Sequence, residues 1–193
     1  LDAVAEDKNY MDKLSNMAAY MMTTFNAQHK AGTGIDSNAT TGLNFYGEND
    51  TAYLWDNGNQ CVQVAKQTVD TGTSGTVAVT TYAPTSTLKG INIINALKVN
   101  SKLTETNGEN LVAARAVNYT SGSSTTTDTT ELYYPSIATL TTTGTKVSYT
   151  ISSTNGTADG SNSVLMSALF NSTQSNTTDK NSTRSIGQVS LES

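Results

Sequence analysis

The chain has 193 residues, a formal net charge of −5, one cysteine and one histidine. Nucleic acids and anionic membrane surfaces attract clustered Lys and Arg side chains, so the acidic balance argues against both as partners. A single cysteine excludes an intrachain disulfide, and 21 Ser with 34 Thr in a chain that is 36% apolar predict a thin core under much polar surface.

The sequence contains no run of about 18 apolar residues, so it predicts no helix that spans a bilayer. The chain begins at Leu1 and has no basic segment followed by an apolar one, as a secretory signal peptide would have. We therefore expect it to be a piece of a longer protein.

The first 31 residues predict one long helix, because apolar residues recur at spacings of three and four and no Gly or Pro interrupts them. Gly32 stands where a glycine commonly ends a helix and turns the chain. His29 lies in the last turn, where it interacts favourably with the helix dipole. The apolar stripe consists of Leu14, Met17, Ala18, Met21, Phe25 and Gln28.

Residues 46–90 predict antiparallel strands. Alternating side chains flank Asn57-Gly58, the pair most typical of a two-residue hairpin turn, which would place Tyr53 opposite Val62. A further strand is predicted at 75–84, where a proline closes it.

The second half alternates between short helices and polar strands. Residues 91–103 fit either a helix or an extended run, and 107–117 predict a short helix. Two strands are predicted in the Ser- and Thr-rich stretch, at 131–140 and 145–152. A last helix follows, in which Ser161 or Asn162 can accept hydrogen bonds from unpaired N–H groups as its N-cap.

The predicted fold class is α+β, with the long N-terminal helix packed against the later helix, an antiparallel β subdomain and a polar β insertion. The expected organisation is a helical segment at 1–45, a β region at 46–90, a return to the helical core at 91–117, the insertion at 118–158, and a helix with a polar tail at 159–193.

His29 invites comparison with a catalytic histidine, which needs an orienting partner and a substrate pocket. The sequence has no G-x-S-x-G nucleophile elbow and no local signal for a Cys–His pair. The favoured interpretation is that His29 caps or packs the helix end.

Other chemistry has equally weak support. Asp36, Asn38 and Thr40 begin like a calcium loop, which then lacks its central glycine and its final Glu, so a polar loop is predicted. We expect no catalytic, cofactor-binding or metal-binding residues and no enzyme activity.

One set of aromatic side chains could either line a carbohydrate groove or pack on one face of the sheet. The set consists of Tyr53, Trp55, Tyr82, Tyr133 and Tyr134.

One resemblance goes further. Residues 10–32, "YMDKLSNMAAYMMTTFNAQHKAG", resemble the helix of bacterial flagellar hook-associated protein 1, the first hook–filament junction protein. The family pattern is a Leu-x-x-Met/Leu-Ala helix ending in N-x-Q-H-x-x-G, followed after a glycine loop by an aromatic residue, here Phe45. The matching positions are Leu14, Met17, Ala18, Asn26, Gln28, His29 and Gly32.

Weaker resemblances follow in the family's order, at 97–103, 110–116, 159–170 and 189–193. Residues 46–90 and 117–158 match no part of the family. The helices that build the family's inner tube are also missing, so the resemblance implies that this fragment is monomeric.

The resemblance implies a structural function and no cofactor. The protein would form a ring of self-copies between hook and filament, in contact with the hook protein and the second junction protein. It would reach the extracellular flagellum through the flagellar type III pathway without a cleaved signal peptide. Asn26, Gln28, His29 and Gly32 would form a structural motif that ends the helix. The competing hypothesis is an extracellular adhesion or glycan-binding module without catalytic activity.

Overall fold

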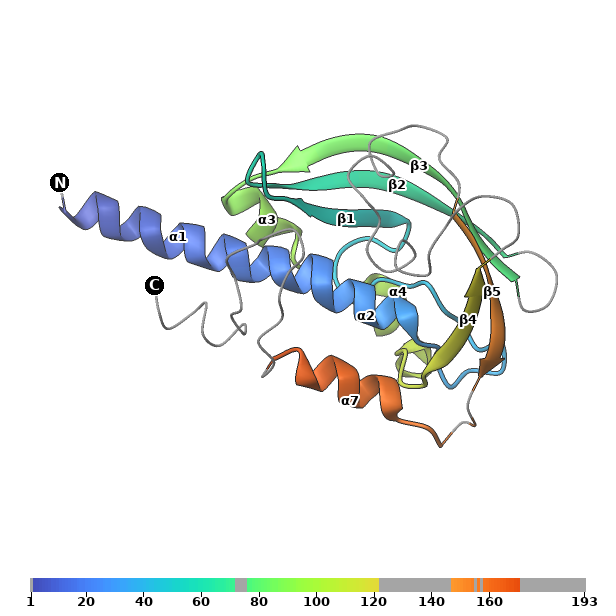
Figure 1. Cartoon of the computed structure of the whole chain (residues 1–193). Coiled ribbons are helices and arrows are strands. Elements are labelled where there is room, and N and C mark those ends of the chain that lie inside the picture. The colour runs from blue at the N-terminus through green and yellow to red at the C-terminus, as the bar shows by residue number, and fades with distance from the viewer. Residues whose placement is uncertain (1, 72–75, 122–146, 155, 157, 171–193) are drawn as a thin grey trace.

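The computed structural model describes residues 2–71, 76–121, 147–154, 156 and 158–170, drawn in colour in Figure 1. Within them the fold is α+β, with helices and an antiparallel sheet, as the sequence predicted. The predicted strand at 131–140, Tyr133, Tyr134 and the stretch at 189–193 lie outside the described residues.

The N-terminal helix is one continuous rod built from three segments. α1 (Asp2–Tyr20) leads into a π-helical turn, η1 (Met21–Phe25), and then into α2 (Asn26–Ala31). Within η1 the Thr23 hydroxyl donates to the Ala19 carbonyl at 2.8 Å. An α-helix would pair that carbonyl with the Thr23 N–H, so the side chain competes with the regular hydrogen-bond ladder.

The strands form one five-stranded antiparallel sheet in the order β1-β2-β3-β5-β4. The predicted β region and the predicted polar insertion therefore contribute to the same sheet, which arches over one side of the helical rod (Figure 1). The strands are β1 (Thr51–Asp56), β2 (Cys61–Thr71), β3 (Thr76–Leu88), β4 (Val117–Ser121) and β5 (Val147–Thr154).

The β1–β2 hairpin exists, but the predicted two-residue turn and its register are wrong. Tyr53 lies opposite Val64, and residues 57–60 form a four-residue connection. The Asp56 carboxylate accepts hydrogen bonds from the backbone N–H of Asn59 at 3.1 Å and from its side-chain amide at 2.7 Å. These bonds favour a wider turn that begins at Asp56.

The predicted end of the next strand is also wrong, because β3 continues through Pro84 to Leu88. Pro84 lies opposite Ala65, beside an irregularity in the pairing between Val64 and Ala65. A bulge of this kind tolerates a residue that has no N–H to donate to the ladder.

The ambiguous stretch at 91–103 contains two short helices, α3 (Ile91–Ala96) and α4 (Ser101–Thr104). The helix predicted at 107–117 is wrong, since only a 3₁₀ turn, η2 (Gly108–Leu111), forms there before the chain extends into β4. The last helix of the described residues is α7 (Ser161–Ala168), which lies against α2 on the side away from the sheet (Figure 1).

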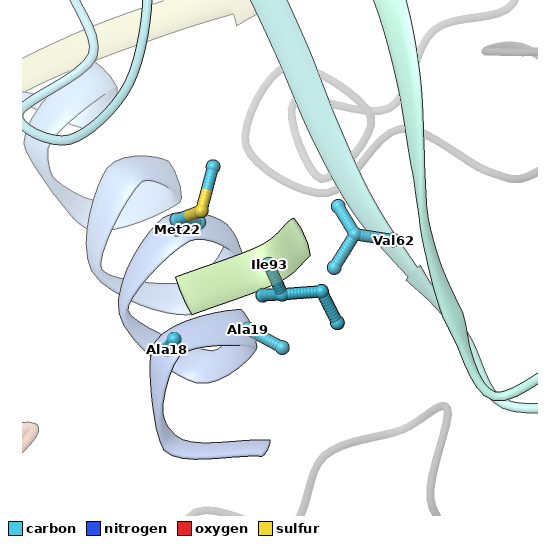
Figure 2. Close-up of a cluster of buried hydrophobic side chains, with 5 residues drawn as sticks. All are labelled: Ala18, Ala19, Met22, Val62 and Ile93. Atoms are coloured by element: carbon cyan, nitrogen blue, oxygen red, sulfur yellow. The ribbon is translucent and has the colours of Figure 1, made fainter. Parts of the chain in front are cut away.

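Among the described residues, two small apolar clusters contribute to the core. In the larger one, Ile93 of α3 lies between the N-terminal helix and Val62 of β2 (Figure 2), and alanines on the helix leave room for this close approach. The smaller cluster joins the N-terminal helix to α7 through Phe25, Met166 and Leu169. A thin core of this size agrees with the polar composition. None of the helices in the described ranges is long and apolar enough to cross a membrane.

Candidate functional site

The site is the last part of the N-terminal helix, where polar residues are buried instead of exposed. Asn26 and Lys30 expose less than a tenth of their surface, and His29 is completely buried. Buried polar groups are costly unless they are hydrogen-bonded, so their partners define what the site does.

Asn26 holds the backbone of the loop that follows the helix. Its Oδ1 accepts from the N–H groups of Phe45 at 3.0 Å and Tyr46 at 2.8 Å, and its Nδ2 donates to the Tyr46 carbonyl at 2.8 Å. The Asn26 amide thus satisfies two backbone donors and one backbone acceptor of this loop. No apolar side chain could replace it without leaving these groups unsatisfied.

His29 links two further segments through its two ring nitrogens. Nδ1 lies 2.8 Å from the Leu43 carbonyl oxygen, and Nε2 lies 3.1 Å from the Ala113 backbone nitrogen. A carbonyl can only accept and an N–H can only donate, so Nδ1 carries the proton and Nε2 is the acceptor. The edge of the ring also packs against Phe45, with centroids 5.3 Å apart.

The surroundings of His29 keep its imidazole neutral. Burial lowers the pKa of His29 from 6.5 to about 4, the hydrogen bond to the Leu43 carbonyl opposes this in part, and the charge of neighbouring Lys30 adds to the lowering. With both nitrogens occupied by backbone groups and no exposed surface, the ring acts as a structural link between segments.

Gln28 and Asn162 fix the orientation of α7 on α2. The Gln28 Nε2 donates to the Asn162 Oδ1 at 2.7 Å, while the Asn162 Nδ2 donates to the carbonyls of Gln28 at 3.2 Å and Ala113 at 2.6 Å. Asn162 is 2% exposed. A reciprocal amide pair of this kind is directional, so it fixes rotation as well as contact between the helices.

Gly32 is required for space, which corrects the expectation that it turns the chain as a left-handed helix-ending glycine. Its φ of −102° and ψ of −175° are extended and open to any residue. A Cβ at this position would lie 2.3 Å from the Asn162 Nδ2 and 2.6 Å from the Arg115 carbonyl oxygen. The glycine therefore lets three segments meet at the helix end.

Beyond Gly32 the chain pairs with the segment that precedes β4. The Thr33 N–H donates to the Arg115 carbonyl at 3.0 Å, and the Arg115 N–H donates to the Thr33 carbonyl at 3.1 Å. The buried Arg115 side chain donates from Nε to the Gly34 carbonyl at 2.8 Å. The helix end is thus held by main-chain pairing as well as by side chains.

The N-cap predicted at Ser161 or Asn162 is wrong. Gly160 occupies that position, and Ser161 is the first residue of α7. The Asp159 carboxylate performs the capping, because it accepts from the Ser161 N–H at 3.2 Å and hydroxyl at 2.8 Å, and from the Ala116 N–H at 3.0 Å. An acidic group at the start of a helix is also favoured by the helix dipole.

Sequence reasoning missed two buried asparagines that extend the same network. The Asn100 Nδ2 donates to the Asn44 carbonyl at 2.8 Å, and its Oδ1 accepts from the Lys102 N–H at 3.0 Å as the N-cap of α4. The Asn44 Nδ2 donates to the Thr51 carbonyl at 2.5 Å. The sequence "NSKL" carries the capping signal for Asn100, whereas nothing local identifies Asn44.

Lys30 was not recognised either. Its Nζ donates to the Gln67 Oε1 of β2 at 2.8 Å, and both side chains are buried. Burial lowers the pKa of Lys30 to about 8. The amide partner carries no charge to offset the cost of desolvating the ammonium group, so this contact fixes the helix to the sheet at an energetic cost.

The remaining sequence candidates have local structural roles. Asp36 accepts from the Thr40 hydroxyl at 2.7 Å and the Thr40 N–H at 3.0 Å, as in a polar turn. Tyr82 is buried, and Tyr53 and Trp55 pack against the larger core cluster, so these three form no exposed platform. Across the described ranges no three His, Cys, Asp or Glu side chains gather as metal ligands would.

The site as a whole is a hydrogen-bonded connection in which side chains of one helix end bind the backbone of the loop at 43–46 and of Ala113, and the side chains of Asn162 and Gln67. Its groups are amides, a neutral imidazole, the Lys30 ammonium group and backbone, which supply position and orientation. Comparison of the chain with protein-family models, with curated proteins and with solved structures finds no match.

Proposed function

We propose that the chain is the central part of a structural subunit of the bacterial flagellum, of the hook-associated protein 1 type, which joins hook to filament. Subunits of this kind would form a ring and contact the hook protein, the second junction protein and one another. The proposal rests on the resemblance of the helix-end motif and on the position of the resembling stretches in space.

The observation that carries the proposal is that stretches scattered through the sequence converge on one network. Asn26 bonds to Phe45, His29 to Ala113, and Gln28 to Asn162. The Asn100 N–H adds a bond of 2.9 Å to the Phe45 carbonyl. Of these partners, Asn100, Ala113 and Asn162 belong to the stretches at 97–103, 110–116 and 159–170, which weakly resemble the family. If each short stretch resembled the family only by chance, nothing would require the stretches to be hydrogen-bonded to one another.

The parts without resemblance also group together. Residues 46–90 and 117–158 supply the strands of the sheet that the structure describes, whose strands β1, β2 and β3 lie on the opposite side of the N-terminal helix from α7 (Figure 1). A framework of helix ends bearing a sheet that does not resemble the family supports a subunit whose core serves assembly and whose sheet is exposed.

The physics of a junction agrees with such a framework. A subunit that joins two assemblies must keep a fixed orientation between its helices under load. Buried, hydrogen-bonded polar networks provide this fixed geometry better than apolar contacts, which are non-directional. The amide pair of Gln28 and Asn162 and the two-sided link of His29 are contacts of this kind.

The proposal is tested by deleting the gene that encodes the chain and examining the cells by electron microscopy. We expect hooks without filaments, monomeric flagellin in the medium, and full recovery when the gene is restored on a plasmid. Antibodies raised against the purified chain should label one point per flagellum, where the hook meets the filament. Retained filaments in the deletion strain, or label along the filament or on the cell body, would contradict the proposal.

A further inference from the structure

We propose that Asn57, in the turn between β1 and β2, is a site of spontaneous deamidation through a succinimide formed with Gly58. The pair was notable in the sequence as a turn signal, and the proposed structural function makes no use of it. The modification would convert a neutral amide at the tip of the hairpin into a carboxylate.

The reaction needs no partner other than water. The backbone nitrogen of Gly58 attacks the Asn57 Cγ, so that a C–N bond forms and the nitrogen loses its proton. The bond from Cγ to Nδ2 breaks, and the Nδ2 leaves as ammonia. Water then opens the succinimide ring at one of its two carbonyls, which gives either an aspartyl or an isoaspartyl residue.

The turn leaves the reacting groups accessible. Asn57, Gly58, Asn59 and Gln60 are all exposed. Gly58 has no side chain to cover the attacking nitrogen, and a Cβ built there would approach only the Asp56 Oδ1, at 3.4 Å.

Gln60 places a donor on the group that is attacked. Its Nε2 lies 2.9 Å from the Asn57 Oδ1 and 2.7 Å from the Asn57 carbonyl oxygen. The Oδ1 becomes negatively charged in the tetrahedral intermediate, where a prepositioned donor stabilises it. Gln60 holds this position from a left-handed backbone conformation, with φ of 48°.

The chain contains a matched control in Asn107-Gly108, the same dipeptide in a different setting. Asn107 has a φ of 64°, and Gly108 is buried at the start of η2. The Gly108 N–H donates to the Glu105 carbonyl at 2.8 Å, so the nitrogen that would attack is held in a backbone hydrogen bond. The structure around this second pair restrains the movement that ring closure requires, since a Cβ on Gly108 would lie 2.5 Å from the Lys102 carbonyl oxygen.

The test is to incubate the purified chain in mildly alkaline buffer and follow both asparagines by peptide mass spectrometry, with separation of aspartyl from isoaspartyl products. We expect Asn57 to convert at least about tenfold faster than Asn107, which corresponds to a barrier difference of about 1.4 kcal/mol. In urea the two rates should become similar. Equal rates in the folded chain, or faster conversion of Asn107, would overturn the proposal.

Two variants test whether the geometry of the turn accelerates deamidation beyond the effect of solvent exposure alone. Gly58→Ala is accommodated by the turn and should slow the reaction, because a Cβ hinders the attacking nitrogen. Gln60→Ala should slow it about tenfold if the donor stabilises the intermediate. An unchanged or increased rate in Gln60→Ala would overturn the role of Gln60, and an unchanged rate in Gly58→Ala would overturn the succinimide route.

Discussion

The buried imidazole of His29 makes a quantitative prediction about stability and pH. Its pKa is about 4 in the folded chain, against 6.5 for an unperturbed histidine. The unfolded chain therefore binds a proton more readily, and folding is favoured when the ring is neutral. The contribution is fully present above pH 6.5 and is lost as the pH falls towards 4. At about 1.4 kcal/mol per pH unit the whole effect is about 3 kcal/mol.

The assay is urea-induced unfolding of the wild type and of His29→Gln at pH 7 and pH 5. Linkage predicts that the wild type loses about 2 kcal/mol between these values through His29. Keeping to pH 7 and below avoids most of the titration of Lys30, whose pKa is about 8. His29 is the only histidine, so the imidazole signals in an NMR titration give its folded pKa directly.

Comparison of the wild type with His29→Gln separates the titration of the His29 imidazole from the titration of all other groups. At pH 7 the variant should lose about 2–4 kcal/mol, because the bonds to Leu43 and Ala113 weaken and the smaller side chain leaves a cavity. Between pH 7 and pH 5 it should then change much less than the wild type. If both proteins lose the same free energy over this interval, His29 is not the titrating group and the reasoning fails.

Further substitutions test the neighbouring contacts by the same unfolding assay. Lys30→Met combined with Gln67→Leu should stabilise the chain by about 1–3 kcal/mol at pH 7, because it removes a buried ammonium group paired only with an amide; a loss of stability would contradict this account. Gly32→Ala should cost about 2 kcal/mol or more, since the new Cβ meets the Arg115 carbonyl, whereas Gly58→Ala should be nearly neutral as its control. Asn162→Leu should lower the free energy of unfolding by about 2–4 kcal/mol, because the hydrogen bonds to Gln28 and Ala113 are lost. Its control is Val164→Ala, on the exposed side of α7, which should lower it by less than about 1 kcal/mol. Equal losses in the two variants would argue against the role of the amide pair.

The sequence predicted elements whose signals are local and repeated. The spacing of apolar residues identified the N-terminal helix, and alternation around Asn57-Gly58 identified the hairpin. The register between β1 and β2 was harder to predict from the sequence, because it depends on the hydrogen bonds that Asp56 accepts from Asn59. Alternation alone is compatible with pairings shifted by two residues, which place the same side chains on the same face.

The candidate site was likewise predicted only in part. Its helix-borne residues were identified from the sequence, but their partners lie far along the chain, as Ala113 does from His29 and Asn162 from Gln28. Gly32 was singled out for the wrong reason, since a need for space looks the same in sequence as a need for a left-handed turn. Lys30 had no signal, because a lysine in the last turn of a helix is normally exposed.

The π-helical turn at Met21–Phe25 has a consequence for how the chain tolerates changes in length. A π turn accommodates one more residue than an α turn, so it resets which side chains face a given direction. Deleting one residue such as Thr23 would permit a regular α-helix in which α2 keeps nearly the same direction, whereas converting the π turn to α-helix at unchanged length would rotate α2 by about 100° relative to α1. His29 and Gln28 would then point away from their partners, although every residue of the motif would still be present. For a helix of this length the π turn is therefore as strict a requirement as the identity of the motif residues.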